Sequence, residues 1–297
     1  MSRPLMVSMF ASAGVIACLL DPLPIAAAAS DPDASGRATQ AGTSDESKLR
    51  ICAAGSELPF SSKDRTGFEN KIAATVAKAM GRESVFVFSD KPAIYLVRDW
   101  LNKQKCDVVV GLDSGDQRVL TTKPYYRAGY VFVTRKDKNI NLESWGDPQI
   151  KSLGHIVVEF GSPSEVMLKE VGRYTDNMAY LYSLVGFRSP RNQYTQIPPQ
   201  KIISEVESGN ADLAAVFAPD VARYVKTNAA LRMTPVKDNA DRDGERVPQQ
   251  YDQSMGVRLG DDALLVALDT ALAKAAPEIA DILRDEGIPT MQVAKSN

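Results

Sequence analysis

The sequence predicts an α/β protein built from two lobes. Apolar, strand-like runs alternate with amphipathic helical segments in both halves of the chain, and this order is typical of parallel βαβ units. The first half reads strand, helix, strand, helix, strand, and a second series begins near residue 155. Two such units place the carboxyl ends of two sets of strands on either side of a cleft.

The first unit starts with a short apolar strand and an amphipathic helix. Phe68, Ile72, Val76 and Met80 recur every four residues and give that helix one apolar face, with Gly81 as its terminator. The elements expected in this unit are strand 49–53, the helix ending at Gly81, strand 85–88, helix 93–104 and strand 106–112.

The second unit opens with a strand that runs directly into a helix start. Ile156 to Val158 form an apolar run, Gly161 permits a sharp turn, and Ser162 with Glu165 fits a capping box. Two interpretations remain open for this turn: an ordinary helix cap, or a site where unpaired N–H groups receive an anion or polar ligand. Further elements are expected at strand 130–134, helix 199–208, strand 211–217, helix 219–225, polar insertion 237–250, strand 254–259 and two closing helices.

The composition and the first residues of the chain exclude some classes of function and indicate others. The 297 residues are 44% hydrophobic and 24% charged, with a formal net charge of -2, so no basic excess exists to neutralise the phosphates of a nucleic acid. Residues 1–29 predict an export signal: Arg3, a short apolar core, and small residues from Ala26 to Ala29. The apolar core is too short for a membrane span. As an alternative, residues 15–18 resemble a lipobox that would lipidate Cys18, and residues 30–47 predict a disordered arm.

Two cysteines, Cys52 and Cys106, remain in the mature chain at strand-like positions. An even pair in an exported protein favours a disulfide, and neighbouring parallel strands would bring the two residues within bonding distance. Two buried free thiols are the alternative.

Several motifs resemble the type II periplasmic solute-binding proteins. They are Leu49-Arg50-Ile51-Cys52-Ala53 with Leu58-Pro59-Phe60, Gly67-Phe68-Glu69, the segment from Cys106 to Gly111 with Arg118, residues 123–130, residues 209–216 and Gly256-Val257-Arg258. The resemblance implies a bilobed type II fold with a two-crossover hinge. The expected lobes are residues 48–137 plus 236–297, and residues 138–235.

A narrower resemblance is to the branch of this family formed by the J proteins of methanol oxidation systems. It is carried by the Cys52/Cys106 pair, by Ile197-Pro198-Pro199 before the segment 205–209, and by Phe217-Ala218-Pro219 where the branch usually has Trp-Gly-Pro. The resemblance implies a periplasmic accessory protein whose partners are the subunits of a pyrroloquinoline-quinone-dependent methanol dehydrogenase.

The resemblance also nominates a ligand site. Arg118 falls where amino-acid-binding members hold the ligand carboxylate; a surface ion pair with Asp113 or Asp116 is the alternative. Phe217 stands where those members carry an acidic ammonium anchor, and Ala54 replaces another acidic residue, so ordinary amino acids are disfavoured. The expected cleft residues are Glu57, Phe60, Asp113, Arg118, Gly161, Ser162 and Phe217.

Enzymatic chemistry and a metal site find little support. His155 is the single histidine and lies among apolar residues, which indicates a structural role. Residues 239–244 imitate the start of a calcium loop, but Gln250 stands where a bidentate Glu is needed. The aromatic stretch 180–187 predicts either core or a protein-facing patch. We therefore expect no catalytic residue, no metal and no cofactor.

Together these observations predict a non-enzymatic periplasmic accessory protein that assists assembly or activity of the dehydrogenase. The alternative is a solute receptor for transport or sensing, which would bind a small anion through Arg118 and the Gly161-Ser162 turn.

Overall fold

The structure is a computed structural model that describes residues 45–185, 196–237, 239–240 and 244–293. The predicted signal segment, Cys18 and nearly all of the predicted arm lie outside these residues, as does the end of the aromatic stretch 180–187. Among the helices in the described ranges, none is long and apolar enough to cross a membrane.

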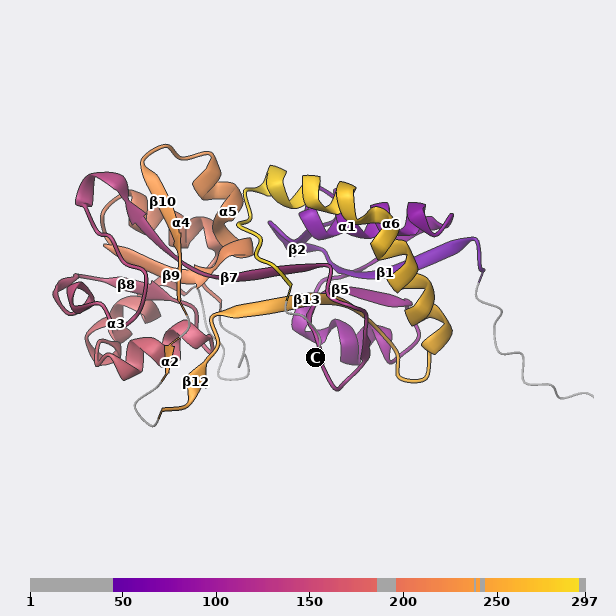
Figure 1. The fold of residues 1–297 in the computed structure, drawn as a ribbon, viewed down its shortest axis with the longest axis horizontal. Coiled ribbons are helices and arrows are strands. Elements are labelled where there is room, and N and C mark those ends of the chain that lie inside the picture. Colours follow the sequence, from indigo (N-terminus) through magenta and orange to yellow (C-terminus); the bar gives the residue numbers. More distant parts are fainter. Residues whose placement is uncertain (1–44, 186–195, 238, 241–243, 294–297) are drawn as a thin grey trace, which may run out of the picture. The chain divides into compact units, whose positions relative to one another are not determined.

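One mixed sheet is the backbone of the fold (Figure 1). Its strand order is β4 (Glu83–Ser89), β1 (Lys48–Ala54), β5 (Val108–Asp113), β13 (Gln250–Val257), β7 (Tyr126–Arg135), β9 (Leu213–Phe217) and β8 (Ile156–Val158). The short strand β6 (Leu120–Thr121) pairs with β13, and β10 (Leu231–Pro235) pairs with β7. Two small hairpins, β2 (Ser56–Glu57) with β3 (Ser61–Ser62) and β11 (Asn239–Ala240) with β12 (Arg246–Val247), complete the strands described.

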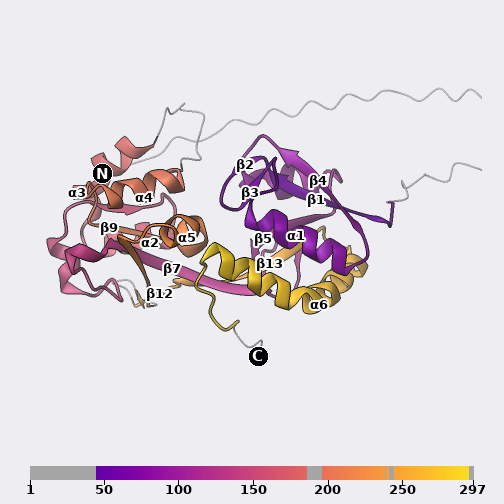
Figure 2. The ribbon, with the colours of Figure 1, turned by 90° about the horizontal axis from the view of Figure 1, so that it is seen from above.

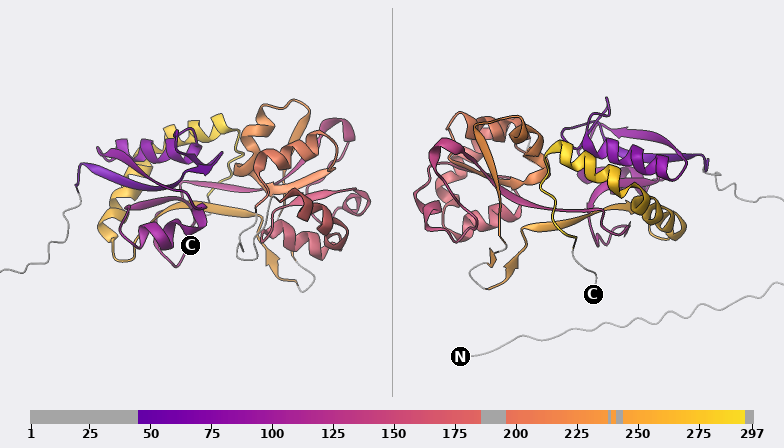
Figure 3. Two further views of the ribbon diagram at one scale, coloured as in Figure 1. Left: turned by 180° about the vertical axis from the view of Figure 1, so that it is seen from behind. Right: turned by 45° about the horizontal axis from the view of Figure 1, so that its top comes forward.

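The two ends of the sheet are parallel and its middle is antiparallel. β1 pairs in parallel with β4 and β5, and β8 pairs in parallel with β9, as expected for βαβ units. Between them the long strand β7 changes partner: residues 126–129 pair with β13, and residues 130–133 pair with β9. Figure 3 shows β7 and β13 running between the two groups of helices.

Each end of the sheet has its own hydrophobic core. In the first, α1 (Phe68–Ala79) and α6 (Asp262–Glu286) pack side by side, as Figure 2 shows, and both cover the sheet. Phe68, Ile72 and Val76 are fully buried, so the four-residue period correctly predicted the face of α1. The second core holds the helices α2 (Pro163–Glu170), α3 (Tyr174–Leu184), α4 (Pro199–Glu207) and α5 (Ala218–Lys226). The lobe boundaries at residues 137/138 and 235/236 stay a prediction.

The disulfide is confirmed: Cys52 in β1 bonds to Cys106, just before β5, with 5.4 Å between their Cα atoms. The register explains the approach, because Cys52 lies opposite Val109 in the parallel pair of β1 and β5. The bond lies in a small core of its own with Leu96, Val97 and Leu101.

Several expected elements differ from the structure. The helix predicted over 93–104 is a 3₁₀ turn, Ala93–Tyr95, followed by a π-helical turn, Val97–Leu101. The wider π turn accommodates an extra residue per turn, and Val97 and Leu101 both reach the core around the disulfide. The strand predicted over 211–217 begins only at Leu213. The strand predicted over 254–259 corresponds to β13, which starts earlier, at Gln250, and ends earlier, at Val257.

The two predicted closing helices form the single helix α6, with Pro277 inside it. A proline costs one helical hydrogen bond, yet buried residues continue on both sides of it, from Leu268 to Leu283. Packing of these buried residues on both sides of Pro277 keeps α6 a single helix. The polar insertion 237–250 contains β11 and β12, and its last residue, Gln250, begins β13 and pairs with Gly129 of β7. Residues 241–243 of the segment that imitates a calcium loop lie outside the described residues.

Candidate functional site

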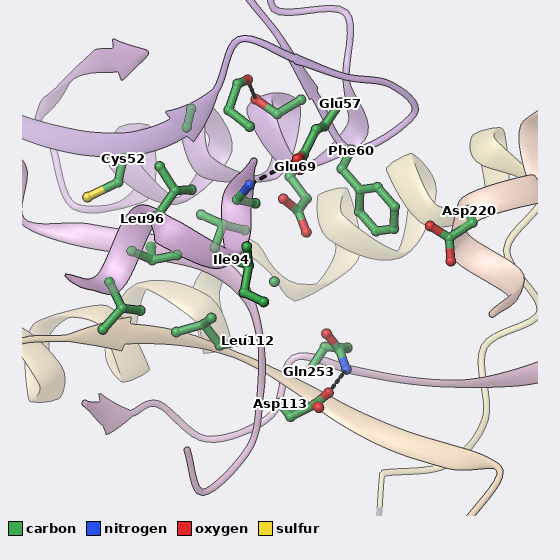
Figure 4. A pocket seen from close by; sticks show the side chains of 18 of the residues that line it. Cys52, Glu57, Phe60, Glu69, Ile94, Leu96, Leu112, Asp113, Asp220 and Gln253 are labelled. Carbon is green, nitrogen blue, oxygen red and sulfur yellow. Dashed lines mark hydrogen bonds between the residues drawn. The ribbon is translucent and has the colours of Figure 1, made fainter. Parts of the chain in front are cut away.

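A cavity of about 690 Å³ opens between the strand ends of the two cores. This volume lies in the range of small-molecule sites in proteins. All seven expected cleft residues line it: Glu57, Phe60, Asp113, Arg118, Gly161, Ser162 and Phe217. Figure 4 shows several of these side chains around the space. Their role in ligand binding stays a prediction.

Four carboxyl groups dominate the chemistry of this cavity. Glu57 comes from β2, Glu69 from the first turn of α1, Glu159 from the turn that follows β8 and Asp220 from the first turn of α5. All four side chains are half-buried. Figure 4 shows Glu57, Glu69 and Asp220 turned toward the same space. Within the described residues, no lysine or arginine forms an ion pair with any of the four.

Burial raises the pKa of each of these groups, and repulsion from neighbouring carboxylates adds to the rise for Glu69 and Asp220. Burial, with a smaller contribution from the charge of Glu57, raises the pKa of Glu69 to about 8, and burial raises that of Glu159 to about 7. Burial raises the pKa of Asp220 well above its usual range, and the charges of Glu159, Glu69 and Glu57 raise it further. The pKa of Glu57 is also raised by burial, opposed by the hydrogen bond that its carboxylate accepts from the Ala93 N–H at 2.9 Å.

The backbone around Glu69 is shaped to receive its carboxyl group. Gly111, in β5, has a φ of 73°, and a Cβ there would lie 1.8 Å from Glu69 Oε1. Glycine is the residue that tolerates both this conformation and this approach. The carboxyl group therefore rests directly against the backbone of β5.

Arg118 lines the cavity but is already paired. Its Nε lies 2.9 Å from Asp116 Oδ1 and its Nη2 lies 2.5 Å from Asp116 Oδ2, a bidentate arrangement. Asp116, two residues away, is therefore its partner in this structure, and Asp113 instead accepts a hydrogen bond from the Gln253 amide at 2.7 Å.

The Gly161-Ser162 turn has the predicted capping geometry, and the chain itself supplies its anion. The Glu165 N–H donates to Ser162 Oγ at 3.2 Å, while the Gly161 N–H donates to Glu165 Oε2 at 2.6 Å. Ser162 Oγ donates to the Glu159 carbonyl at 2.7 Å. The ordinary helix cap, one of the two open interpretations, is what these contacts describe.

Phe217 forms part of the wall of the cavity without filling it. Its ring packs near those of Tyr130 and Tyr251, at centroid distances of 5.6 and 6.4 Å. The expectation that the acidic anchors have disappeared with Phe217 and Ala54 needs correction, because Asp220, three residues after Phe217, and Glu69 supply carboxyl groups to the same space.

Sequence reasoning missed Glu69, Glu159 and Asp220. Glu159 directly follows β8, and Asp220 lies three residues after the end of β9, in the first turn of α5. At such positions the side chains of βα turns gather at one sheet edge. Their positions after strand ends could therefore have identified both residues as candidates for the site. The sequence offers no such indication for Glu69, since an acidic residue in the first turn of a helix is common on solvated helices.

His155 lies outside the cavity and directly before β8. The side chain is exposed and stacks on Tyr180, with 4.0 Å between ring centroids. Tyr180 in turn donates a hydrogen bond to Glu205 at 2.7 Å. In the part of the chain that the structure describes, no three His, Cys, Asp or Glu residues are arranged to hold a metal ion.

The mixed sheet, the two cores and the cavity between the strand ends define a protein of the solute-binding class. The chain belongs to the bacterial extracellular solute-binding proteins, family 3, whose family model matches residues 49–282. The predicted type II solute-binding fold is confirmed, and so is the prediction of a solute-binding protein rather than an enzyme.

Within this family, the chain is similar to several individual proteins. The chain is 55% identical over 270 residues to Protein MoxJ of Methylorubrum extorquens, covering 90% of each chain. It is 45% identical over 249 residues to Protein MoxJ of Paracoccus denitrificans, covering 83% of this chain and 90% of the relative. The crystal structure of MxaJ from Methlophaga aminisulfidivorans MPT matches with a TM-score of 0.79 and 47% identity, covering 82% of this chain and all of that one. The resemblance to the J proteins is confirmed.

Proposed function

We propose that this chain is a periplasmic, non-enzymatic accessory protein of a methanol oxidation system. In this role it assists assembly or activity of the pyrroloquinoline-quinone-dependent methanol dehydrogenase by binding one or more of its subunits. The observation that carries the proposal is the 55% identity to a MoxJ protein over 90% of both chains. Identity of this extent over 90% of both chains supports a common role, whereas similarity in fold alone would not.

The role is tested in a methylotrophic host that carries this gene. A deletion strain should lose methanol-dependent growth and periplasmic dehydrogenase activity, and plasmid-borne wild-type protein should restore both. In parallel, the tagged mature protein should recover dehydrogenase subunits from periplasmic extract. Normal methanol oxidation in the deletion strain, together with a pull-down that contains no dehydrogenase subunit, would overturn the proposal.

A solute receptor is the second candidate, and the open cavity of about 690 Å³ favours it. The small anion first expected as its ligand is less well supported. Arg118 is engaged by Asp116, the Gly161 N–H is engaged by Glu165, and four further carboxyl groups face the space. A thermal-shift screen of small anions tests this candidate: an anion that raises the melting temperature of the wild type and not of Arg118→Ala supports it, and a screen without such an anion removes it.

A further inference from the structure

The positions best suited to hold a ligand carboxylate are already filled by carboxylates of this chain. The Asp116 carboxylate accepts hydrogen bonds from both Nε and Nη2 of Arg118. Glu165 accepts the Gly161 N–H and also pairs with Lys169 at 2.9 Å. A ligand carboxylate would have to displace an intramolecular partner at either place, and would gain no new cation in exchange.

The positions suited to a cation, in contrast, are unfilled by the protein. Glu57, Glu69, Glu159 and Asp220 face the cavity from four separate elements, and within the described chain no basic side chain pairs with them. Bringing four carboxyl groups together in a half-buried space is costly unless a positive charge or protons neutralise them. The cavity is therefore complementary to positive charge.

The spread of these groups distinguishes an organic cation from a metal ion. A metal ion needs three or more ligands converging on one point, and the described residues contain no such cluster. Apolar side chains also line the walls, among them Phe60, Ile94 and Phe217. Such walls suit the methylene groups of an alkylamine, while the carboxyl groups suit its charged ends.

We propose that this cavity binds an organic cation that carries no carboxylate: a protonated amine or a guanidinium group, held by Asp220, Glu159, Glu69 and Glu57. The cation belongs either to a free polyamine or to a basic side chain of a bound polypeptide. In the second case the cavity is also the point where a partner docks. The inference does not rest on the proposed accessory role, since a free amine would satisfy the same groups.

Binding should release protons. The empty cavity holds protons on its carboxyl groups near neutral pH, and a bound cation favours the ionised form, so each protonated group that ionises returns one proton to solvent. Affinity should therefore rise between pH 6 and pH 8. The charged and titratable groups that face the cavity are Glu57, Glu69, Asp113, the Arg118–Asp116 pair, Tyr130, Glu159 and Asp220.

The experiment is isothermal titration calorimetry on the full exported chain at low salt. The probes are spermidine, an acetylated and amidated pentalysine peptide, and, as anions, L-glutamate and acetate. We expect at least one cationic probe to bind, with proton uptake by the buffer, and neither anion to bind. Spermidine alone identifies a free amine as the ligand, whereas the peptide alone identifies a basic segment of a partner.

Variants locate the binding to the cavity. Asp220→Asn and Glu69→Gln should each weaken the cationic probe by about tenfold, since a charged partner is lost, and Arg118→Ala should not weaken it. Asp90→Asn is the matched control: its carboxylate is 86% exposed, pairs with Lys63 and lies outside the cavity, so affinity should not change.

Circular dichroism establishes that each variant is folded, and the proton-release measurement on the wild type needs no variant. The inference is overturned if no cationic probe binds the wild type at about 1 mM, or if an anion binds and loses affinity in Arg118→Ala. It is equally overturned if Asp90→Asn weakens the cation as much as Asp220→Asn does. None of these outcomes bears on the pull-down of dehydrogenase subunits, so the two proposals fail separately.

Discussion

Arg223 in α5 holds both carboxylate oxygens of Glu286 at the end of α6. Its Nε lies 2.6 Å from Glu286 Oε2 and its Nη2 lies 2.9 Å from Oε1. The Arg223 Nη2 also donates to the Thr66 carbonyl at 3.1 Å, and Lys71 reaches Glu286 at 3.3 Å. Because α5 packs into the second core and α6 into the first, this ion pair ties the two cores together away from β7 and β13.

Arg223→Ala should destabilise the protein by about 2 kcal/mol, because the Glu286 side chain, only 6% exposed, loses its bidentate partner. Urea unfolding measures the change. Arg118→Ala is the matched control: it also removes an arginine from a bidentate pair, but that side chain is 55% exposed, and we expect a loss below about 1 kcal/mol. An equal decrease in the free energy of unfolding in both variants would show that the pair between the cores stabilises the protein no more than an exposed ion pair does.

Gly111→Ala should be more damaging than Gly115→Ala, although both glycines have a positive φ, 73° and 84°. The strained backbone costs about 1–3 kcal/mol in either variant. At Gly115 an added Cβ meets nothing within 4 Å, whereas at Gly111 it collides with the Glu69 carboxyl group. The difference between the two unfolding free energies measures that contact. If the two variants are equally destabilised, Glu69 does not rest on β5 as described.

The ligand-free protein should lose stability as the pH rises from 5 to 8. The pKa of Glu69 is about 8 in the folded state against an ordinary value of 4.5, so between these values the folded state binds the extra proton and stability falls with increasing pH. The slope for one such group is at most about 1.4 kcal/mol per pH unit. Urea unfolding at four pH values measures it.

Glu69→Gln should make this pH profile less steep, since the amide does not titrate; Glu159 and Asp220, whose pKa values are also raised, account for the slope that remains. Carboxylates with lowered pKa values do not obscure the comparison: the Lys48 ammonium holds the pKa of Asp45 at about 2, so its contribution changes below pH 5. A profile in the variant as steep as that of the wild type would exclude Glu69 as its source.

Removal of the disulfide by Cys52→Ala together with Cys106→Ala should lower the free energy of unfolding by about 3 kcal/mol. The bond closes a loop between residues 54 positions apart and so restricts the unfolded chain. Unfolding of oxidised wild type, reduced wild type and the double variant measures the effect. The reduced wild type should match the double variant to within about 1 kcal/mol; a reduced protein as stable as the oxidised one would contradict the prediction.

Local pattern was sufficient for the elements whose contacts are local. The period of four in Phe68, Ile72 and Val76 marks the buried face of α1 because helix geometry alone puts these side chains on one side. The Ser162–Glu165 cap was likewise predictable, since both groups lie within one helical turn. Pattern failed for α6, where Pro277 predicts a break that the packing of the flanking apolar residues against the first core overrides.

The sequence by itself determined the α/β class, the disulfide pair and seven of the residues that line the cavity, because motif, strand end and periodicity are properties of short segments. Only the tertiary structure decided the sign of the cavity's charge. Glu69 and Asp220 are 151 positions apart, each in the first turn of an unremarkable helix. Their electrostatic interaction depends on how close the two helix starts lie in space and how much water separates them, and packing sets both quantities.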